Sequence, residues 1–332
     1  DAGGDVEGDL QYDLEDGAEF GGSDKNAEPF ESAEEIGLPS DSLGEEPDHD
    51  LTEESEKARR LAEIFDGYLG TMERFYNQFL LIPEGSYKVG SAAPKRDERP
   101  QEIVHIPAFY MGKFPVTNAL FEVFVDKTGY MTTAEKVGYG TVYYGRLCKE
   151  VDEKNGAVRF RCNGTVHSKT VEGAFWYQPC GPGSTLHKKR DHPVVQVSLE
   201  DAMAYASWTG KRLPKEDEWE AAARSAQGYV FPWGNEWKGG ACNIEDHEIA
   251  DTTPVDSFKE ATNQLAIVDT LGNVQEWTSD VFPYSEQPRN SSRHYIAKGG
   301  SWVSGKDIRL FHRTKIRADT SSNILGFRCV AQ

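Results

Sequence analysis

The sequence predicts an α+β fold that is rich in loops, and two observations support this. Apolar residues recur with helical spacing in some stretches and alternate as in strands in others. The chain also combines 32 Gly with 7 Trp, 14 Tyr and 16 Phe, which favours aromatic-packed loops over a helical bundle. A length of 332 residues allows one large domain or two ordinary ones.

The charge is concentrated at the N-terminus. Residues 1–57 hold 21 Asp and Glu and two Lys, whereas the rest of the chain is balanced, so the net charge of −19 belongs to this segment. Its low apolar content predicts a disordered acidic tail over residues 1–50, with a specific acidic docking role as the alternative. The balanced remainder argues against a nucleic-acid partner held by a broad basic surface.

An amphipathic helix is predicted over residues 51–79, with Thr52 as its N-cap. Its apolar stripe consists of Leu61, Phe65, Tyr68, Met72, Phe75 and Phe79. Two interpretations stay open. The stripe packs against the following domain, or it forms a short coiled coil interrupted by Gly67 and Gly70.

Residues 80–332 show mixed signals that predict one α+β domain. A strand, a turn and a second strand are expected over 80–91, and a helix over 118–127. A capping-box pattern at Ser198 begins another helix. A third is expected over 215–224, with Pro214 in its first turn.

Five cysteines occur without a zinc-type spacing. Cys148 and Cys162 flank Asn155-Gly156, which is a strong hairpin signal. If this dipeptide forms a two-residue turn, the two cysteines lie one residue away from directly opposite positions on the paired strands. A disulfide, which would indicate an oxidising compartment, and two free thiols are both left open.

The C-terminal part carries the most distinctive pattern, Lys298-Gly-Gly-Ser-Trp302 followed by Gly326-Phe-Arg-Cys329. Two adjacent glycines indicate a backbone with positive φ or a very close approach to a neighbour. From these residues alone, two interpretations stay open: a buried hairpin and a functional loop.

Nine short segments in a fixed order resemble the formylglycine-generating-enzyme, or sulfatase-modifying-factor, family. They are Val116-Thr-Asn118, His192-Pro-Val194, Gly210-Lys-Arg-Leu-Pro214, Glu218-Trp219, Phe231-Pro-Trp-Gly-Asn235, Gly272-Asn273, Glu276-Trp277, Gly299-Gly-Ser301 and Gly326-Phe-Arg-Cys329. The resemblance implies a variant of the C-type-lectin fold over residues 80–332.

The same resemblance argues against copper chemistry. Family enzymes bind copper through two cysteines, three and eight residues after the Ser of Gly-Gly-Ser, and a thiolate pair suits Cu(I). Here these positions are Ser304 and Arg309. The cysteine that the resemblance implies as the partner of Cys329 maps to Ala206. A related iron-dependent branch needs a histidine-rich N-terminal domain, yet residues 1–80 contain only His49.

Calcium is the cofactor that the resemblance favours. Carboxylate and carbonyl oxygens on one tight loop suit this ion. The alternative is that Glu276 only caps backbone donors. The implied ligands are Asp269, Gly272, Val274 and Glu276 for one site, with Asn243 and Ile244 as part of a second.

The function expected is therefore a non-catalytic protein that binds an unknown protein or glycan ligand. Its binding face would resemble that of the variable cell-surface proteins of diversity-generating retroelements. The candidate contacts are Tyr295, Trp302, Ser304, Lys306, Asp307, Arg309, Phe311, His312 and Thr314. The alternative is an oxygen-dependent oxidase or cysteine-modifying enzyme with a non-standard metal site.

No apolar run is long enough to span a membrane. The chain does not begin with Met, and export to the cell surface or the periplasm is the location expected. Lipid or surface tethering would then act through the N-terminal tail.

Overall fold

The computed structural model describes residues 51–95, 98–151, 158–162, 164–283 and 293–332. The acidic tail predicted over residues 1–50 lies outside these ranges. The α-helices are α1 (Leu51–Tyr68), α2 (Thr71–Tyr76), α3 (Asn118–Thr128), α4 (Thr133–Val137), α5 (Leu199–Trp208) and α6 (Glu216–Arg224). Two 3₁₀ turns follow, η1 (Glu245–His247) and η2 (Lys259–Ala261).

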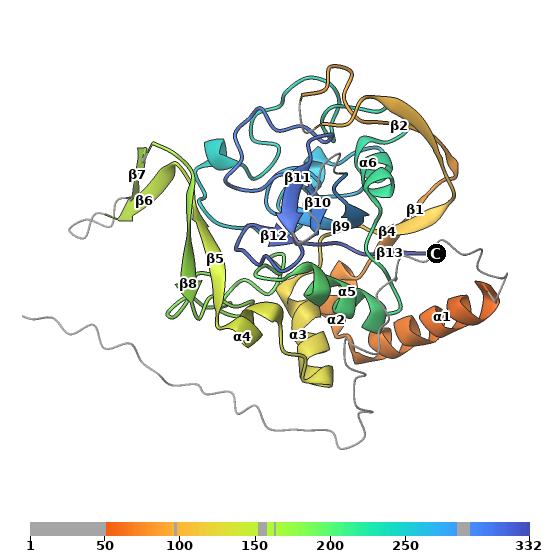
Figure 1. Cartoon of the computed structure of the whole chain (residues 1–332), viewed down its shortest axis with the longest axis horizontal. Helices are drawn as coiled ribbons and strands as arrows, with labels where there is room; N and C mark the ends of the chain where they lie inside the picture. The colour runs from red at the N-terminus through yellow and green to blue at the C-terminus, as the bar shows by residue number, and fades with distance from the viewer. Residues whose placement is uncertain (1–50, 96–97, 152–157, 163, 284–292) are drawn as a thin grey trace, which may run out of the picture.

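The strands form small antiparallel or mixed sheets rather than one large sheet (Figure 1). One sheet has the order β1-β4-β13, from Phe79–Ile82, Phe109–Gly112 and Val330–Ala331. A second has the order β11-β10-β9-β12, from Thr314–Arg317, His294–Lys298, Gln275–Val281 and Leu325–Gly326. Three pairs complete the fold: β2 (Gly85–Val89) with β3 (Glu102–Ile106), β5 (Tyr139–Tyr144) with β8 (His167–Glu172), and β6 (Leu147–Val151) with β7 (Val158–Cys162).

The N-terminal helix differs from the sequence prediction because it is broken. The chain forms α1 and α2, separated by Leu69 and Gly70, and Gly70 is extended with φ −76° and ψ −176°. The described part of α1 already includes Leu51, so Thr52 lies within the helix and is not its N-cap. Phe65 and Leu69 are buried in the main core, so part of the stripe packs against the domain as one interpretation predicted.

Local signals fixed the later helices. Thr117 caps α3, and Gly129 follows it in the left-handed region with φ 67°. The capping box at the start of α5 is present, with Ser198 and Asp201 exchanging side-chain and backbone hydrogen bonds. Pro214 was expected in the first turn of α6, but it precedes the N-cap Lys215 and so lies outside the helix.

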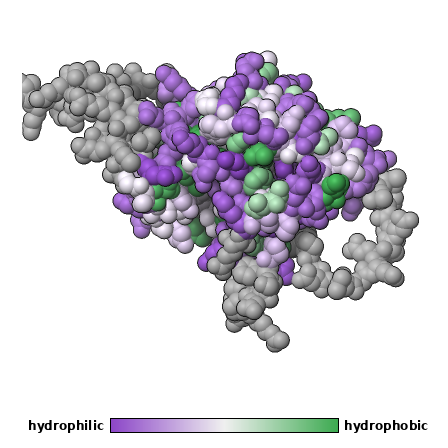
Figure 2. All heavy atoms as spheres, turned by 90° about the horizontal axis from the view of Figure 1, so that it is seen from above, coloured by the Kyte–Doolittle hydropathy of each residue, from purple (hydrophilic) through white to green (hydrophobic). Residues whose placement is uncertain are grey.

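Two large apolar clusters hold these elements together. The first surrounds Phe121, Tyr205 and Phe327, whose rings pack at centroid distances of 5.4–6.5 Å. The second surrounds Trp219, where α6 packs against β2 and β9. The face of the molecule seen in Figure 2 is mainly hydrophilic, with only separate hydrophobic residues. Among the described residues, no helix has the length and apolar character needed to cross a membrane.

The antiparallel pairing of β6 with β7 leaves the two cysteines out of register. Cys148 pairs with Arg161, and Cys162 pairs with Leu147. They are thus one residue from direct opposition, as the sequence predicted. The side chains of both cysteines lie outside the described part of the structure.

Candidate functional site

The candidate site is the loop of residues 299–313, here called the C-terminal loop, which connects β10 to β11. Its first two residues have positive φ, 88° at Gly299 and 68° at Gly300. A Cβ atom on Gly299 would lie 2.9 Å from the carbonyl oxygen of Thr270. The sequence suggested two reasons for glycine here, a positive φ and a close approach to a neighbour. Both apply at Gly299.

Both ends of this loop bind the same carboxylate on α6. Before the loop, Lys298 is fully buried, and its Nζ lies 3.3 Å from Glu216 and 2.7 Å from Glu220. At its last residue, Arg313 makes a bidentate pair with Glu216, at 2.7 and 2.5 Å. Since Glu216 and Glu220 lie one turn apart, a single face of α6 holds the loop closed.

The charges beneath the loop compensate one another. Glu220 also accepts hydrogen bonds from the Gly90 amide at 2.8 Å and from Arg224 at 2.9 Å. Burial opposes its ionisation, but Lys298 and Arg224 outweigh that effect and lower the pKa of Glu220. This network fixes both ends of the loop.

Ser304 and Arg309, the positions where copper-binding thiols would be expected, are both engaged within the protein. The Ser304 hydroxyl accepts a hydrogen bond from the Ser301 amide at 3.0 Å. The Arg309 guanidinium donates to the carbonyls of Lys306 and Ile308 at 3.0 and 2.8 Å. A hydroxyl and a guanidinium do not provide the soft anionic ligands that Cu(I) prefers, so copper does not fit this site.

Arg309 also covers an aromatic cluster. Its guanidinium carbon lies 4.6 Å from the centroid of the Phe231 ring. Trp233 stacks on the same ring at 5.6 Å, and Trp237 meets it edge-on at 5.3 Å. The Leu310 amide donates to the Val230 carbonyl at 3.2 Å, which ties the two loops together.

The predicted contact residues do not form one continuous surface. Lys306 and Asp307 are exposed at the tip of the loop, and Ser304, Arg309, Phe311 and His312 are half-buried around them. Trp302 is buried and packs with Val303 and Ile324, so it supports the loop from within. Tyr295 lies on β10 against the main core, and Thr314, on β11, pairs with Ala297 of β10.

The implied calcium ligand Glu276 has side-chain partners, not the backbone donors considered from the sequence. Arg328 makes a bidentate pair with it at 2.6 and 2.7 Å, and Trp219 donates its indole N–H at 2.7 Å. All three side chains are buried. Most of the acceptor capacity of Glu276 is therefore used within the protein.

Two other implied ligands have free oxygens. Asp269 accepts from the Asn273 amide through Oδ2 at 2.6 Å, while its buried Oδ1 receives no hydrogen bond in the described structure. Asn243 donates to the Asp251 carbonyl at 2.8 Å, and its Oδ1 is likewise buried without a partner. Burial raises the pKa of Asp269 to about 8. Buried oxygens without donors are what a hard cation would satisfy, so these residues fit calcium better than the loop fits copper.

The described residues contain no cluster of three or more His, Cys, Asp and Glu side chains that could hold a metal by themselves. A calcium ion bound near Asp269 would therefore need backbone carbonyl oxygens, such as those of Gly272 and Val274. This ligand set stays a prediction.

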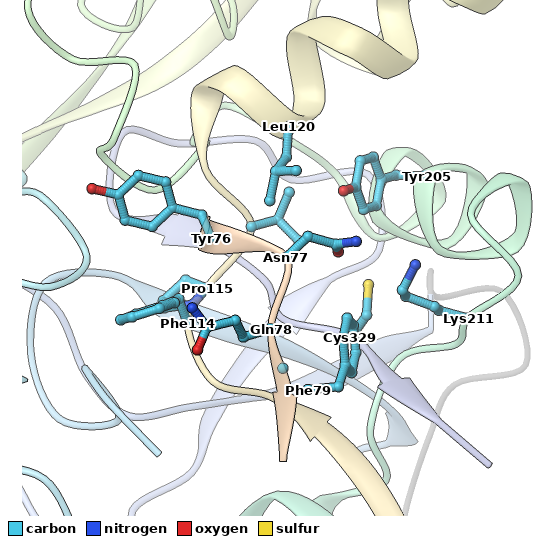
Figure 3. Close-up of a pocket in the computed structure, with 12 residues that line it drawn as sticks. Tyr76, Asn77, Gln78, Phe79, Phe114, Pro115, Leu120, Tyr205, Lys211 and Cys329 are labelled. Atoms are coloured by element: carbon cyan, nitrogen blue, oxygen red, sulfur yellow. The ribbon is translucent and has the colours of Figure 1, made fainter. Parts of the chain in front are cut away.

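A small cavity lies away from the loop, between the α2–β1 connection and the main core (Figure 3). Tyr76 and Phe114 line one side, and Tyr205, Lys211 and Cys329 line the other. Cys329 is a free thiol, and burial raises its pKa to about 12, so it is unreactive at neutral pH.

Comparison with known proteins places this geometry in a family. The family described as "Sulfatase-modifying factor enzyme 1-like domain" matches residues 68–332. The chain belongs to the sulfatase-modifying-factor family. The match begins at the end of α1 and includes α2, so it extends further toward the N-terminus than the motifs indicated.

Relatives with and without activity are similar to this sulfatase-modifying-factor chain. The formylglycine-generating enzyme of Bos taurus is 38% identical over 279 residues, covering 75% of this chain and 73% of the relative. The inactive Cα-formylglycine-generating enzyme 2 of Bos taurus is 35% identical over 269 residues, covering 75% and 86%. The formylglycine-generating enzyme of Thermomonospora curvata is 33% identical over 284 residues, covering 75% and 92%.

Solved structures confirm the α+β fold of this family. PvdO from Pseudomonas aeruginosa aligns with a TM-score of 0.53 and 21% identity, covering 76% of this chain and 94% of that one. Treponema denticola variable protein 1 aligns with a TM-score of 0.51 and 17% identity, with the same coverage. At these identities the comparison shows the shared fold.

Sequence reasoning missed the residues that anchor the loop, Lys298, Glu216, Glu220 and Arg313. Glu216 and Glu220 lie four residues apart, a spacing that is equally typical of a solvent-exposed helix face. Their cationic partners are nearly 80 to 97 residues away in sequence, and no local pattern identifies them.

Proposed function

We propose that this protein is a non-catalytic, ligand- or protein-binding member of the sulfatase-modifying-factor family, with the C-terminal loop as its binding surface. The proposal rests on the residues at positions 304 and 309, where Ser and Arg replace the copper-binding cysteines of the family. There a hydroxyl caps the turn and a guanidinium covers Phe231. Overall identity does not decide the question, since an active and an inactive relative are 38% and 35% identical.

The loop has features that suit recognition. Its tip presents the opposite charges of Lys306 and Asp307, while its two ends are fixed through Glu216. Fixed ends reduce the conformational entropy lost when a partner binds. Arg309 and the neighbouring tryptophans add the residue types that are enriched at interface centres.

The experiment has a chemical arm and a binding arm. The purified full chain is incubated with Cu(I) and assayed for oxygen consumption with a cysteine-containing peptide. We expect neither stoichiometric copper nor turnover. Stoichiometric copper binding or measurable turnover would support the alternative, an oxidase or cysteine-modifying enzyme with a non-standard metal site.

The binding arm uses protein and glycan arrays. Any ligand found is tested against K306A/D307A, which removes the exposed charges of the loop tip. The matched control is K169A/E172A, which removes the same kinds of charge from the exposed strand β8. We expect the loop variant to lose affinity by about tenfold or more, roughly 1.4 kcal/mol, while the control binds as the wild type does. Equal loss in both variants would contradict the assignment of the loop.

Calcium is part of this proposal as a structural ion. The unpartnered oxygens of Asp269 and Asn243 support it, and the saturation of Glu276 argues that Glu276 contributes little to binding. Bound calcium would offset the repulsion between Asp269 and Glu276 beneath the Gly-Gly-Ser turn. It would thus stabilise the base of the loop.

We further propose that the protein is exported, that its binding face is displayed at a cell surface, and that this face varies between sibling sequences. The fold shared with Treponema denticola variable protein 1 motivates this, together with the exposed tip of the loop. Sibling sequences that differ mainly at residues 293–323 would support variation. Divergence spread evenly over the domain would contradict it.

A further inference from the structure

His312 lies in the C-terminal loop, and each of its two ring nitrogens has a partner. Its Nδ1 accepts a hydrogen bond from the Arg309 amide at 3.3 Å. Its Nε2 lies 3.1 Å from Oε1 of Glu98, which belongs to the connection between β2 and β3. The imidazole thereby joins the loop to a segment more than 200 residues away.

These contacts define one protonation state. A ring nitrogen that accepts from an amide N–H carries no proton, so Nδ1 is unprotonated and Nε2–H donates to Glu98. The His312 amide also donates to the Arg309 carbonyl at 3.0 Å. The turn from Arg309 to His312 is therefore closed twice, once by the backbone and once by the neutral ring.

We propose that this turn is a pH-sensitive latch on the binding loop: protonation of His312 opens the turn and releases Arg309 from Phe231. A proton on Nδ1 would face the Arg309 amide, placing two donors against each other. The loop then loses the side-chain half of its closure, and the Phe231, Trp233 and Trp237 cluster beneath Arg309 becomes accessible. What the latch regulates rests on the proposed function, whereas the latch itself does not.

The surroundings of His312 set the pH range. Burial lowers the pKa of His312, and Glu98 opposes this by favouring the charged ring. Among the described residues, the other charged groups that face the ring are Lys95, Arg309 and Asp307. Lys95 and Arg309 lower the pKa of His312 further, as burial does. Asp307 raises it, as Glu98 does. The side chain of His312 is 22% exposed, and that of Glu98 is 8% exposed.

The sign of the effect follows from this lowered pKa. The open loop binds a proton with the ordinary pKa of histidine, 6.5, and the closed loop binds it more weakly. The latch is therefore fully stable above pH 6.5, and its stability is lost as the pH falls from 6.5 toward the lowered value. One proton changes the opening equilibrium by at most about tenfold per pH unit.

Two ligand-free measurements on the full chain test the latch, so failure to find a ligand does not affect them. NMR titration of the histidine rings gives the pKa and the tautomer of His312. Hydrogen exchange at about pH 7.5 and about pH 5, corrected for intrinsic rates, reports opening of residues 305–313. We expect a pKa below 6.5, the Nε2–H tautomer, and faster exchange of the loop at the lower pH.

Three variants sharpen the test. His312→Asn keeps an acceptor near the Arg309 amide and should make exchange of the loop insensitive to pH. Glu98→Gln removes the charge that favours protonation of the closed loop, so it should lower the pKa of His312 further and widen the difference in loop exchange between the two pH values, which a merely structural contact would not do. His167→Asn, on exposed β8, is the matched control and should behave as the wild type does.

The proposal is overturned by any of three results. These are a His312 pKa at or above 6.5, the Nδ1–H tautomer, or loop exchange that is equal at both pH values. A smaller difference in loop exchange between the two pH values in Glu98→Gln than in the wild type would also overturn it, and this variant decides the matter if His312→Asn fails to fold.

Discussion

At the scale of single residues, the protein places charges in its core and pairs them closely. Arg328 is buried and gives both ends of its guanidinium to Glu276. It also donates to the backbone carbonyls of Gly112, Val268 and Asp269, at 3.0–3.2 Å. One side chain thus connects β4, the segment before β9 and the C-terminal strand.

Replacing Arg328 with Ala should destabilise the fold by about 3–5 kcal/mol, because Glu276 would remain as a buried and uncompensated charge. The measurement is the unfolding free energy from urea denaturation at neutral pH. Arg317→Ala serves as the control, since Arg317 pairs with Asp319 at the surface and should have little effect. A small effect of Arg328→Ala would show that Glu276 is neutralised in another way.

Asp269 gives a prediction about pH and calcium. Burial raises its pKa from 3.8 to about 8 in the folded protein, so the folded state holds this proton more tightly than the unfolded state. The contribution of Asp269 to stability is complete below pH 3.8 and is lost as the pH rises toward 8.

Calcium at Asp269 would reverse this loss. Without calcium, Asp269→Asn should therefore be more stable relative to the wild type at about pH 8 than at about pH 5. With calcium, the melting temperature of the wild type should rise and that of the variant should not. Calorimetric titration of chelator-treated protein measures the ion directly, and no uptake would refute the calcium site.

At the scale of elements, α1 is the clearest addition to the family domain. Only its last residue falls within the family match, yet it docks on the core. The Phe65 ring meets Trp208 at 5.4 Å and Tyr205 at 6.0 Å, and Lys211 Nζ lies 5.0 Å from its centroid. Gly210 leaves room for the α1 backbone, since a Cβ there would overlap the Ala58 carbonyl.

Phe65→Ala should cost about 3–5 kcal/mol, as expected for a buried aromatic side chain, and should make α1 sensitive to limited proteolysis. Its neighbour Ile64 is 50% exposed, against 1% for Phe65. Ile64→Ala should stay within about 0.5 kcal/mol of the wild type. Equal effects of the two substitutions would mean that α1 does not dock through Phe65.

The sequence predicted elements wherever the cause is local. Ser198 with Asp201, Thr117 with Gly129, and the glycines before Ser301 each carry their own structural reason. The family resemblance predicted the arrangement of these elements. The break at Leu69–Gly70 was missed because the apolar stripe continues across it. The pairs His312–Glu98 and Arg328–Glu276 were missed because their partners are distant in sequence, and only the fold brings them together.

At the scale of the whole molecule, the charge and the fold are separate properties. Residues 1–57 carry the entire net charge of −19, while the charges of the remaining chain balance. The ionic contacts that hold the C-terminal loop lie within that balanced part. We therefore expect the fold not to depend on the acidic segment for charge compensation.

Deleting residues 1–50 removes 18 acidic residues and one lysine. It should greatly weaken retention on an anion-exchange column and leave the melting temperature nearly unchanged. Differential scanning calorimetry of the two proteins makes the comparison. A clear fall in melting temperature would refute a tether and would support the alternative that the acidic segment docks on the domain.

The attachment of both ends of the C-terminal loop to Glu216 bears on protein engineering. Lys298 and Arg313 bracket the loop, so its closure is set outside the positions that would contact a partner. Doubling the length of such a segment adds only about 0.6 kcal/mol of closure entropy. The scaffold should therefore accept grafted or randomised segments between Ser304 and Arg309, and a display library built there would select binders without redesign of the core.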